Sequence, residues 1–157
     1  MIEDQIINSA TIADYFLMKS AMTPKKVQKL VYYAYAWFIA LNNQSEDEIS
    51  QVLFSEKPEA WIHGPVFPSL YDKYKEYGWH EIERNKNVVT FKNKDLAKFL
   101  DRIWEIYGKK YSADELEYMT HQELPWRNAR IGVAANAPCV KKIDLKDIFN
   151  YYNEAIA

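Results

Sequence analysis

The clearest structural signal in the chain is residues 23–41, which read TPKKVQKLVYYAYAWFIAL. Thr23 can accept hydrogen bonds from free backbone N–H groups, and Pro24 suits the first position of a helix. From Val27 onward the apolar residues keep the helical period. The most apolar part, residues 30–41, would form a helix about 18 Å long, whereas a bilayer core is about 30 Å thick. It therefore predicts a central helix buried on nearly all sides.

Helical spacing and capping signals recur on both sides of this stretch. The expected N-terminal residues of six helices are Thr11, Thr23, Pro68, Asn93, Ser112 and Asp144. Gly78 and Gly108 are placed at helix C-termini, residues 63–68 predict a turn, and residues 79–91 predict a small hairpin around 85–87. The expected fold is mainly α: a single compact domain over residues 1–157, with about six helices and a minor β-hairpin.

Length and composition restrict the class of protein. The chain has 157 residues, of which 48% are hydrophobic and 27% charged, and this excludes intrinsic disorder. Its 20 Lys and Arg against 22 Asp and Glu give no strong positive field, so nucleic acid is not the expected partner. Arg127 and Arg130, with three lysines close by, are interpreted as a solvated face. The single Cys139 suits the reducing cytoplasm.

Aromatic residues are unusually frequent at 15%, including 12 Tyr and 5 Trp. Large aromatic side chains fill cores, and Tyr and Trp also dominate binding hot spots. The tyrosines of residues 32–35 are interpreted as core. Two other helices carry aromatic residues beyond one inward face, which predicts exposed rings for a partner. These candidate partner-binding residues are Tyr74, Tyr77, Tyr151 and Tyr152.

Motifs for catalysis are weak. The sequence has no Gly-rich phosphate loop, no Gly-x-Ser-x-Gly, no His-Glu-x-x-His and no Cys-x-x-Cys. His121 and Glu123, with His63, could form an acid/base or metal site, so a metal- or His-dependent hydrolase is kept as the alternative function. Structural hydrogen bonding is favoured, because a spacing of two residues on a helix points side chains about 200° apart. No catalytic residue, metal or cofactor is predicted.

Three blocks together resemble a known family. They are VQKLVYYA at 27–34, AWIHGPV at 60–66 leading into Leu70 and Tyr71, and THQELPWRNAR at 120–130. They look like the signature blocks of the Panacea-domain antitoxins, which are SocA-like and also described as GepA-like phage-associated proteins. The resemblance runs from about Thr23 to Arg130.

The resemblance implies a mainly helical, cytoplasmic antitoxin of a bacterial or phage toxin–antitoxin pair, without enzymatic activity. Its partner would be a co-encoded protein toxin that is neutralised by direct binding. One studied member acts as an adaptor that delivers its toxin to a protease, so a cellular protease is a second potential partner. No membrane is implied, and self-association is left open.

The shared blocks more often hold a scaffold or line a groove when one family serves many partners. The residues that match the signatures are Trp61, His63, Gly64, Pro65, Tyr71, Thr120, His121, Glu123, Pro125 and Trp126. Gly64 and Pro65 are interpreted as a turn that allows close helix approach. Trp61 and Trp126 are interpreted as large rings of the core or of a groove.

Overall fold

The computed structural model describes residues 6–156, so residues 1–5 and 157 of the expected domain lie outside the described part. The elements are α1 (Ser9–Leu17), α2 (Pro24–Asn42), β1 (Glu59–Trp61), β2 (Gly64–Val66), α3 (Pro68–Tyr74), the 3-10 turn η2 (Lys75–Tyr77), α4 (Lys94–Ile103), the π-helical turn η3 (Trp104–Gly108), α5 (Ala113–Gln122), α6 (Leu124–Ala129) and α7 (Leu145–Ile156). The fold is mainly α, as the sequence predicts. Within residues 6–156, every helix is too short or too polar to cross a bilayer.

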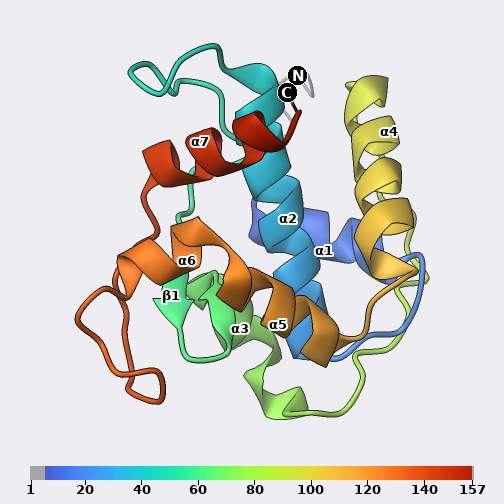
Figure 1. Cartoon of the computed structure of the whole chain (residues 1–157). Coiled ribbons are helices and arrows are strands. Elements are labelled where there is room, and N and C mark those ends of the chain that lie inside the picture. The colour runs from blue at the N-terminus through green and yellow to red at the C-terminus, as the bar shows by residue number, and fades with distance from the viewer. Residues whose placement is uncertain (1–5, 157) are drawn as a thin grey trace.

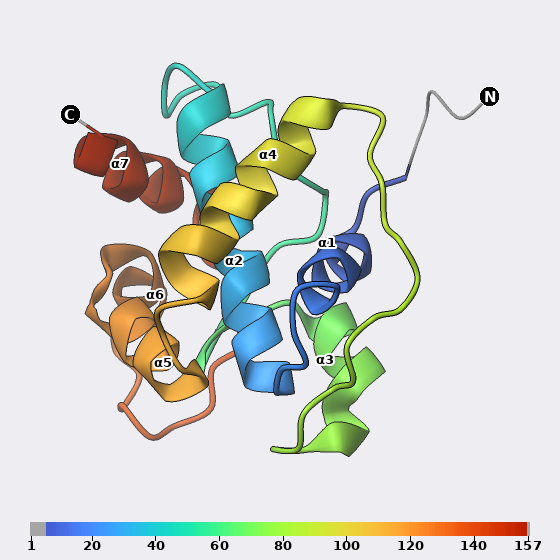
Figure 2. The same cartoon turned by 90° about the vertical axis from the view of Figure 1, so that its right-hand side faces the viewer.

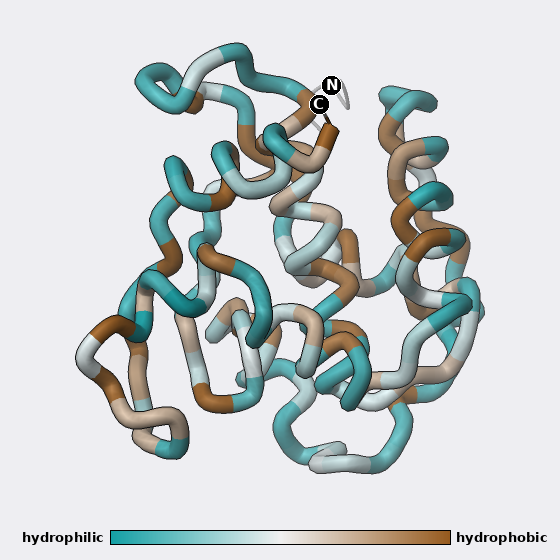
Figure 3. Tube along the Cα trace, viewed as in Figure 1, coloured by the Kyte–Doolittle hydropathy of each residue, from teal (hydrophilic) through white to brown (hydrophobic). Residues whose placement is uncertain are grey.

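Helix α2 is the axis of the molecule, and the other helices pack around it (Figures 1 and 2). Its predicted start is confirmed, because the Thr23 hydroxyl accepts from Lys26 N at 3.3 Å and Pro24 occupies the first turn. The polar loop that follows α2 is exposed, and it stands out as hydrophilic in Figure 3. The sequence signal of residues 23–41 therefore corresponds to the element that organises the fold.

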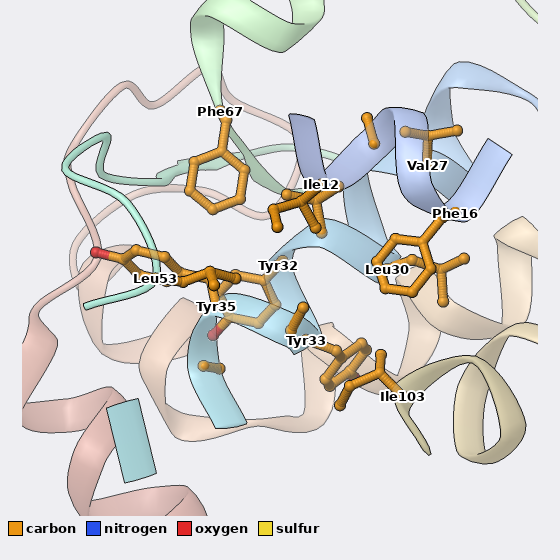
Figure 4. Packing of buried hydrophobic residues seen from close by; sticks show 14 of the residues in the cluster. Ile12, Phe16, Val27, Leu30, Tyr32, Tyr33, Tyr35, Leu53, Phe67 and Ile103 are labelled. Carbon is orange, nitrogen blue, oxygen red and sulfur yellow. The ribbon is translucent and has the colours of Figure 1, made fainter. Parts of the chain in front are cut away.

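The core around α2 combines aliphatic side chains with many aromatic rings (Figure 4). Tyr32, Tyr33 and Tyr35 are at most 1% exposed, which confirms their prediction as core residues. The ring of Tyr33 stacks on that of Tyr107 with centroids 4.1 Å apart, and Tyr35 meets Phe67 edge-on at 5.4 Å. Such pairs stabilise beyond the area they bury.

Two predicted helix boundaries hold and one is wrong. Ser112 and Glu115 form the expected capping box of α5, and Asn93 caps α4. Helix α1, however, begins at Ser9 and is capped by Asn8, whose Oδ1 accepts from Thr11 N at 2.9 Å. Thr11 is the third helical residue. Its hydroxyl accepts from the Asn8 backbone N–H and so completes a capping box.

The small hairpin exists, but not where it is predicted. Strands β1 and β2 pair antiparallel, with Ala60 opposite Pro65, so part of the predicted turn is strand. Ala60 N points away from β2 and donates to Lys141 O at 2.9 Å, so residues 60 and 65 face each other without hydrogen bonds between them. Pro65, which has no N–H to donate, therefore fits this position. Residues 85–89 instead run along the end of α1, where Asn85 N donates to Leu17 O at 2.9 Å.

The C-terminal third differs from the prediction in its number of helices. Pro125 lies in the first turn of α6, where the missing N–H of proline does no harm. Helix α6 is thus one helix more than the six expected. Asp144 precedes α7 as predicted, and its Oδ1 accepts from Lys146 N at 2.8 Å.

Candidate partner-binding cavity

Two polar side chains of α2 bind the free edge of β2 and the residue after it. The Gln28 side chain makes both backbone hydrogen bonds of Phe67, accepting from N at 3.0 Å and donating to O at 3.1 Å. Lys29 Nζ donates to Pro65 O at 3.0 Å. Gln28 is 5% exposed and Lys29 only 1%. These side chains take the place of a third strand, because they satisfy backbone groups that would otherwise be buried without partners.

Gly64 leaves room for the Lys29 side chain. Its φ is +104°, a conformation that other residues rarely adopt. A Cβ at this position would lie 2.7 Å from Lys29 Cε and 2.9 Å from Thr120 Oγ1. The close approach expected at Gly64 is therefore made by side chains of α2 and α5.

We expect Gly64→Ala to lower the free energy of unfolding by about 3 kcal/mol, because it combines steric overlap with an unfavourable φ. Gly132→Ala is the matched control: its φ is +84° and nothing lies within 4 Å of the added Cβ, so only the backbone term of about 1 kcal/mol applies. Urea denaturation of both variants measures the difference. Equal losses would contradict the role of Gly64 in making room for Lys29.

Glu117 of α5 connects the hairpin to α2. Its Oε1 lies 2.6 Å from Lys25 Nζ, and its Oε2 lies 2.9 Å from His63 Nδ1. Lys25 also pairs with Asp114 at 3.0 Å, and His121 Nε2 is 3.9 Å from Glu117 Oε2. Burial acts to raise the pKa of Glu117, but hydrogen bonds from Lys25 and His63 outweigh it and leave the pKa below its ordinary value. The Glu117 carboxylate therefore stays charged and fixes both partners.

Trp126 and Arg130 bind the hairpin through hydrogen bonds to carbonyl groups of β1. Trp126 Nε1 donates to Trp61 O at 2.8 Å, and its ring stacks on His121 with centroids 4.0 Å apart. Arg130 Nη1 donates to Ala60 O at 2.9 Å, and its guanidinium lies 5.0 Å from the Trp126 ring. Burial lowers the pKa of His121, so its imidazole is neutral at pH 7. Residues 120–130, the third family block, thus contact residues 60–66, the second block.

Arg130 also fixes the loop of residues 131–140. Its Nη2 donates to Ala134 O at 2.9 Å and to Ala137 O at 2.7 Å, and the residue is only 5% exposed. The interpretation of Arg130 as part of a solvated face is therefore wrong. Arg127 is exposed, as expected of such a face.

A cavity of about 510 Å³ lies between the hairpin, the start of α2, α3 and residues 138–140. Its mainly apolar walls include Trp61, Val66, Leu70, Tyr71, Tyr74 and Val140. Its polar lining includes Lys25, Lys29 and His63, and none of the residues that line it is acidic. Volume and composition are those of a site for a ligand or for partner side chains.

Lys29 is a buried cation beside this cavity. Burial lowers the pKa of its ammonium to about 7, although the nearby Glu117 carboxylate acts in the opposite direction. A lysine in the unfolded chain has a pKa of about 10.4. The folded protein therefore holds Lys29 partly unprotonated at pH 7, at a cost in stability.

This buried lysine predicts a pH dependence of stability. Between pH 7 and pH 10 the unfolded state binds more protons at Lys29 than the folded state, so the free energy of unfolding rises with pH. The rise amounts to about 1.4 kcal/mol per pH unit, and Lys29→Met should remove it. Urea denaturation of parent and variant at pH 8 and pH 9.5 measures the two slopes. Identical slopes would contradict the burial of a titrating lysine.

The predicted site residues separate into two groups. Trp61, His63, Tyr71 and Tyr74 line the cavity, and Trp61 and Tyr71 meet with ring centroids 4.9 Å apart. Gly64 and Pro65 lie directly behind it, against Lys29. The second group lies on α5 and α6 and consists of Thr120, His121, Pro125 and Trp126, of which Thr120 lies against Gly64 and Trp126 donates to Trp61 O.

The four candidate partner tyrosines differ in exposure. Tyr77 is 38% exposed, whereas Tyr74 is 8% exposed. Tyr151 is half-buried and Tyr152 is only 2% exposed, because it belongs to the core between α7 and α2. Tyr152 therefore offers no free surface to a partner, and a role of the other three in binding stays a prediction.

Glu123 is part of a buried network rather than of the histidine pair. Its Oε2 accepts from the Tyr33 hydroxyl at 2.9 Å, and its Oε1 accepts a short hydrogen bond from Tyr152. Burial raises the pKa of Glu123 to about 7. The carboxylate between His63 and His121 is Glu117 instead. Among residues 6–156, no three His, Cys, Asp or Glu side chains are grouped to hold a metal ion.

Sequence reasoning missed Lys29, Glu117 and Arg130 as site residues. Lys29 had a readable signal, because it interrupts the apolar face of a helix expected to be buried on nearly all sides. Glu117 and Arg130 had none, because their partners lie 54 and 70 residues away in the chain.

The family model described as "Antitoxin SocA-like, Panacea domain" matches residues 27–127. The chain belongs to this family. No curated protein and no solved structure gives a significant match.

The Panacea domain matched in the sequence contains most of the cavity. Lys29, Trp61, Gly64 and Glu117 lie within residues 27–127. Arg130, Val140 and all of α7 lie beyond it. In this Panacea protein, residues outside the matched region therefore complete one wall of the cavity and part of the core.

Proposed function

We propose that this Panacea-domain protein is an antitoxin that keeps a co-encoded protein toxin inactive by binding it directly. The observation that carries the proposal is the family match over residues 27–127. The cavity supports it, because exposed apolar side chains at its mouth are typical of a surface that binds protein. The protein would act in the cytoplasm, where the lone Cys139 stays reduced.

In this proposal the shared blocks have an architectural role. The contacts of Gly64, Glu117 and Trp126 join the hairpin to α2, α5 and α6. The shape of the cavity depends on those contacts, so the shared blocks would be needed whichever toxin is bound. Discrimination between toxins would then depend on residues at the cavity mouth and beyond the matched region.

Expression of the neighbouring reading frame with and without this chain tests the proposal. The neighbour alone is expected to stop growth, and co-expression is expected to restore it. Circular dichroism of the purified antitoxin provides the folding control. Continued growth arrest in the presence of folded antitoxin would reject neutralisation.

Sequestration and adaptor activity give different outcomes in the same strains. Sequestration predicts a complex that co-purifies, with the toxin level unchanged. Adaptor activity predicts that the toxin level falls only in cells that contain the cellular protease. Immunoblotting of the toxin after synthesis is blocked distinguishes the two mechanisms.

A further inference from the structure

We propose that the cavity receives an apolar side chain of the toxin together with a carboxylate that lies beside it in the toxin sequence. This inference rests on the proposed function and adds the chemistry of the partner segment. The cavity supplies an apolar surface for the first group and the buried Lys29 ammonium for the second.

The buried Lys29 favours an anionic group in the cavity. The basic side chains that line the cavity are Lys25, Lys29 and His63, but Lys25 and His63 are already paired with Glu117, so Lys29 is the lining cation without an ion-pair partner among the described residues. An ammonium carries three N–H donors, yet within residues 6–156 Lys29 makes one hydrogen bond, to Pro65 O. A buried charge with unused donors is unfavourable, and a carboxylate is the group that satisfies it best. The carboxylate of a partner would thus complete the environment of Lys29.

The hairpin cannot recruit a partner strand, so recognition has to use side chains. One edge of β1 pairs with β2, and its other edge is taken by residues 141–143 through Ala60 N to Lys141 O and Ile143 N to Pro58 O, both 2.9 Å. The outer edge of β2 is covered by Gln28 and Lys29. Strand addition needs a free edge, and the described hairpin leaves none.

The mouth of the cavity indicates a protein partner. Val140 is 70% exposed and Tyr71 is 43% exposed, and both line the cavity. Trp79, which follows the cavity residue Gly78, is 83% exposed. An apolar pocket continued by exposed apolar and aromatic side chains is the arrangement of an interface hot spot with its surroundings. A segment of a folded partner can cover this rim, whereas a free small acid would leave it in water.

A pair of opposite charges at Val140 tests the proposal. Val140→Glu places a carboxylate at the cavity mouth and Val140→Lys places an ammonium there, on a side chain whose exposure lets both variants fold. The probe is the purified, catalytically inactivated product of the neighbouring toxic reading frame, and titration calorimetry at 50 mM NaCl measures its Kd. We expect Val140→Glu to bind at least tenfold more weakly than Val140→Lys, and Lys29→Met at least tenfold more weakly than the parent.

Val88 provides the matched control, because it is 81% exposed and does not line the cavity. Val88→Glu and Val88→Lys should bind within twofold of the parent. Equal Kd values for the two Val140 variants would contradict the proposal that the toxin segment carries a carboxylate. Parent-like binding by all variants would contradict the cavity as the binding site and leave the proposed function intact. Failure of the parent chain to bind the probe would overturn both proposals.

Discussion

Arg130→Ala is expected to lower the free energy of unfolding by about 3–5 kcal/mol, which is about 10 °C in the thermal midpoint of a chain this size. The guanidinium is 5% exposed and donates to Ala60, Ala134 and Ala137 carbonyl oxygens at 2.7–2.9 Å. Its removal leaves buried acceptors without donors and takes away the ring contact with Trp126. Thermal unfolding followed by circular dichroism measures the loss.

Two further variants make this test specific. Arg127→Ala removes an exposed arginine three residues away and should change stability by no more than about 0.5 kcal/mol. Arg130→Lys keeps the charge but loses the planar guanidinium, whose N–H groups reach both β1 and the 131–140 loop. Most of the loss in the free energy of unfolding should therefore remain. A parent-like Arg130→Ala would mean that the loop is not held by this side chain.

Glu123→Ala is expected to cost about 3–4 kcal/mol, because it leaves the buried hydroxyls of Tyr33 and Tyr152 without their acceptor and opens a cavity between α2 and α7. Glu123→Gln keeps an acceptor and a similar volume, so it isolates the effect of charge. Chemical denaturation from pH 4.5 to pH 8 measures both.

The sign of the pH effect follows from the raised pKa of Glu123, about 7 in the folded protein against 4.5 ordinarily. The folded state keeps a proton that the unfolded state releases, so this contribution is fully present below pH 4.5 and is lost as the pH rises to 7. The parent should therefore lose about 3 kcal/mol relative to Glu123→Gln across this window. Glu154→Gln, at an exposed position of α7, is the control and should follow the parent. Parallel curves for the parent and Glu123→Gln would contradict a buried, titrating carboxyl.

Local signals placed most of the helices, but they misplaced the start of α1 and did not indicate α6. Thr23 and Pro24 mark the start of α2 in the sequence itself, and the capping box of Ser112 and Glu115 does the same for α5. The hairpin was misplaced because its strands depend on distant groups. Extended residues 64–67 are satisfied by Gln28 and Lys29, which lie 36 to 39 residues earlier in the chain.

In the candidate site too, local sequence identified some residues, whereas contacts with distant parts of the chain could not be predicted. The family blocks identified Trp61, His63, Gly64 and Tyr71, which the fold places at or directly behind the cavity. Their spacing could not reveal that Lys29 lies beneath Gly64. Nor could it show that Glu123 belongs to a tyrosine network, because Tyr152 lies on α7.

In the proposed function the protein inhibits its toxin by binding it stoichiometrically and not by catalysing a reaction on it. Titration of the purified toxin with this chain, with residual toxin activity as the readout, tests it most directly. Binding predicts that inhibition increases linearly and is complete at a fixed stoichiometric ratio, and that it reverses when the complex is diluted below its Kd. Complete and irreversible inactivation by a small fraction of an equivalent would contradict the account.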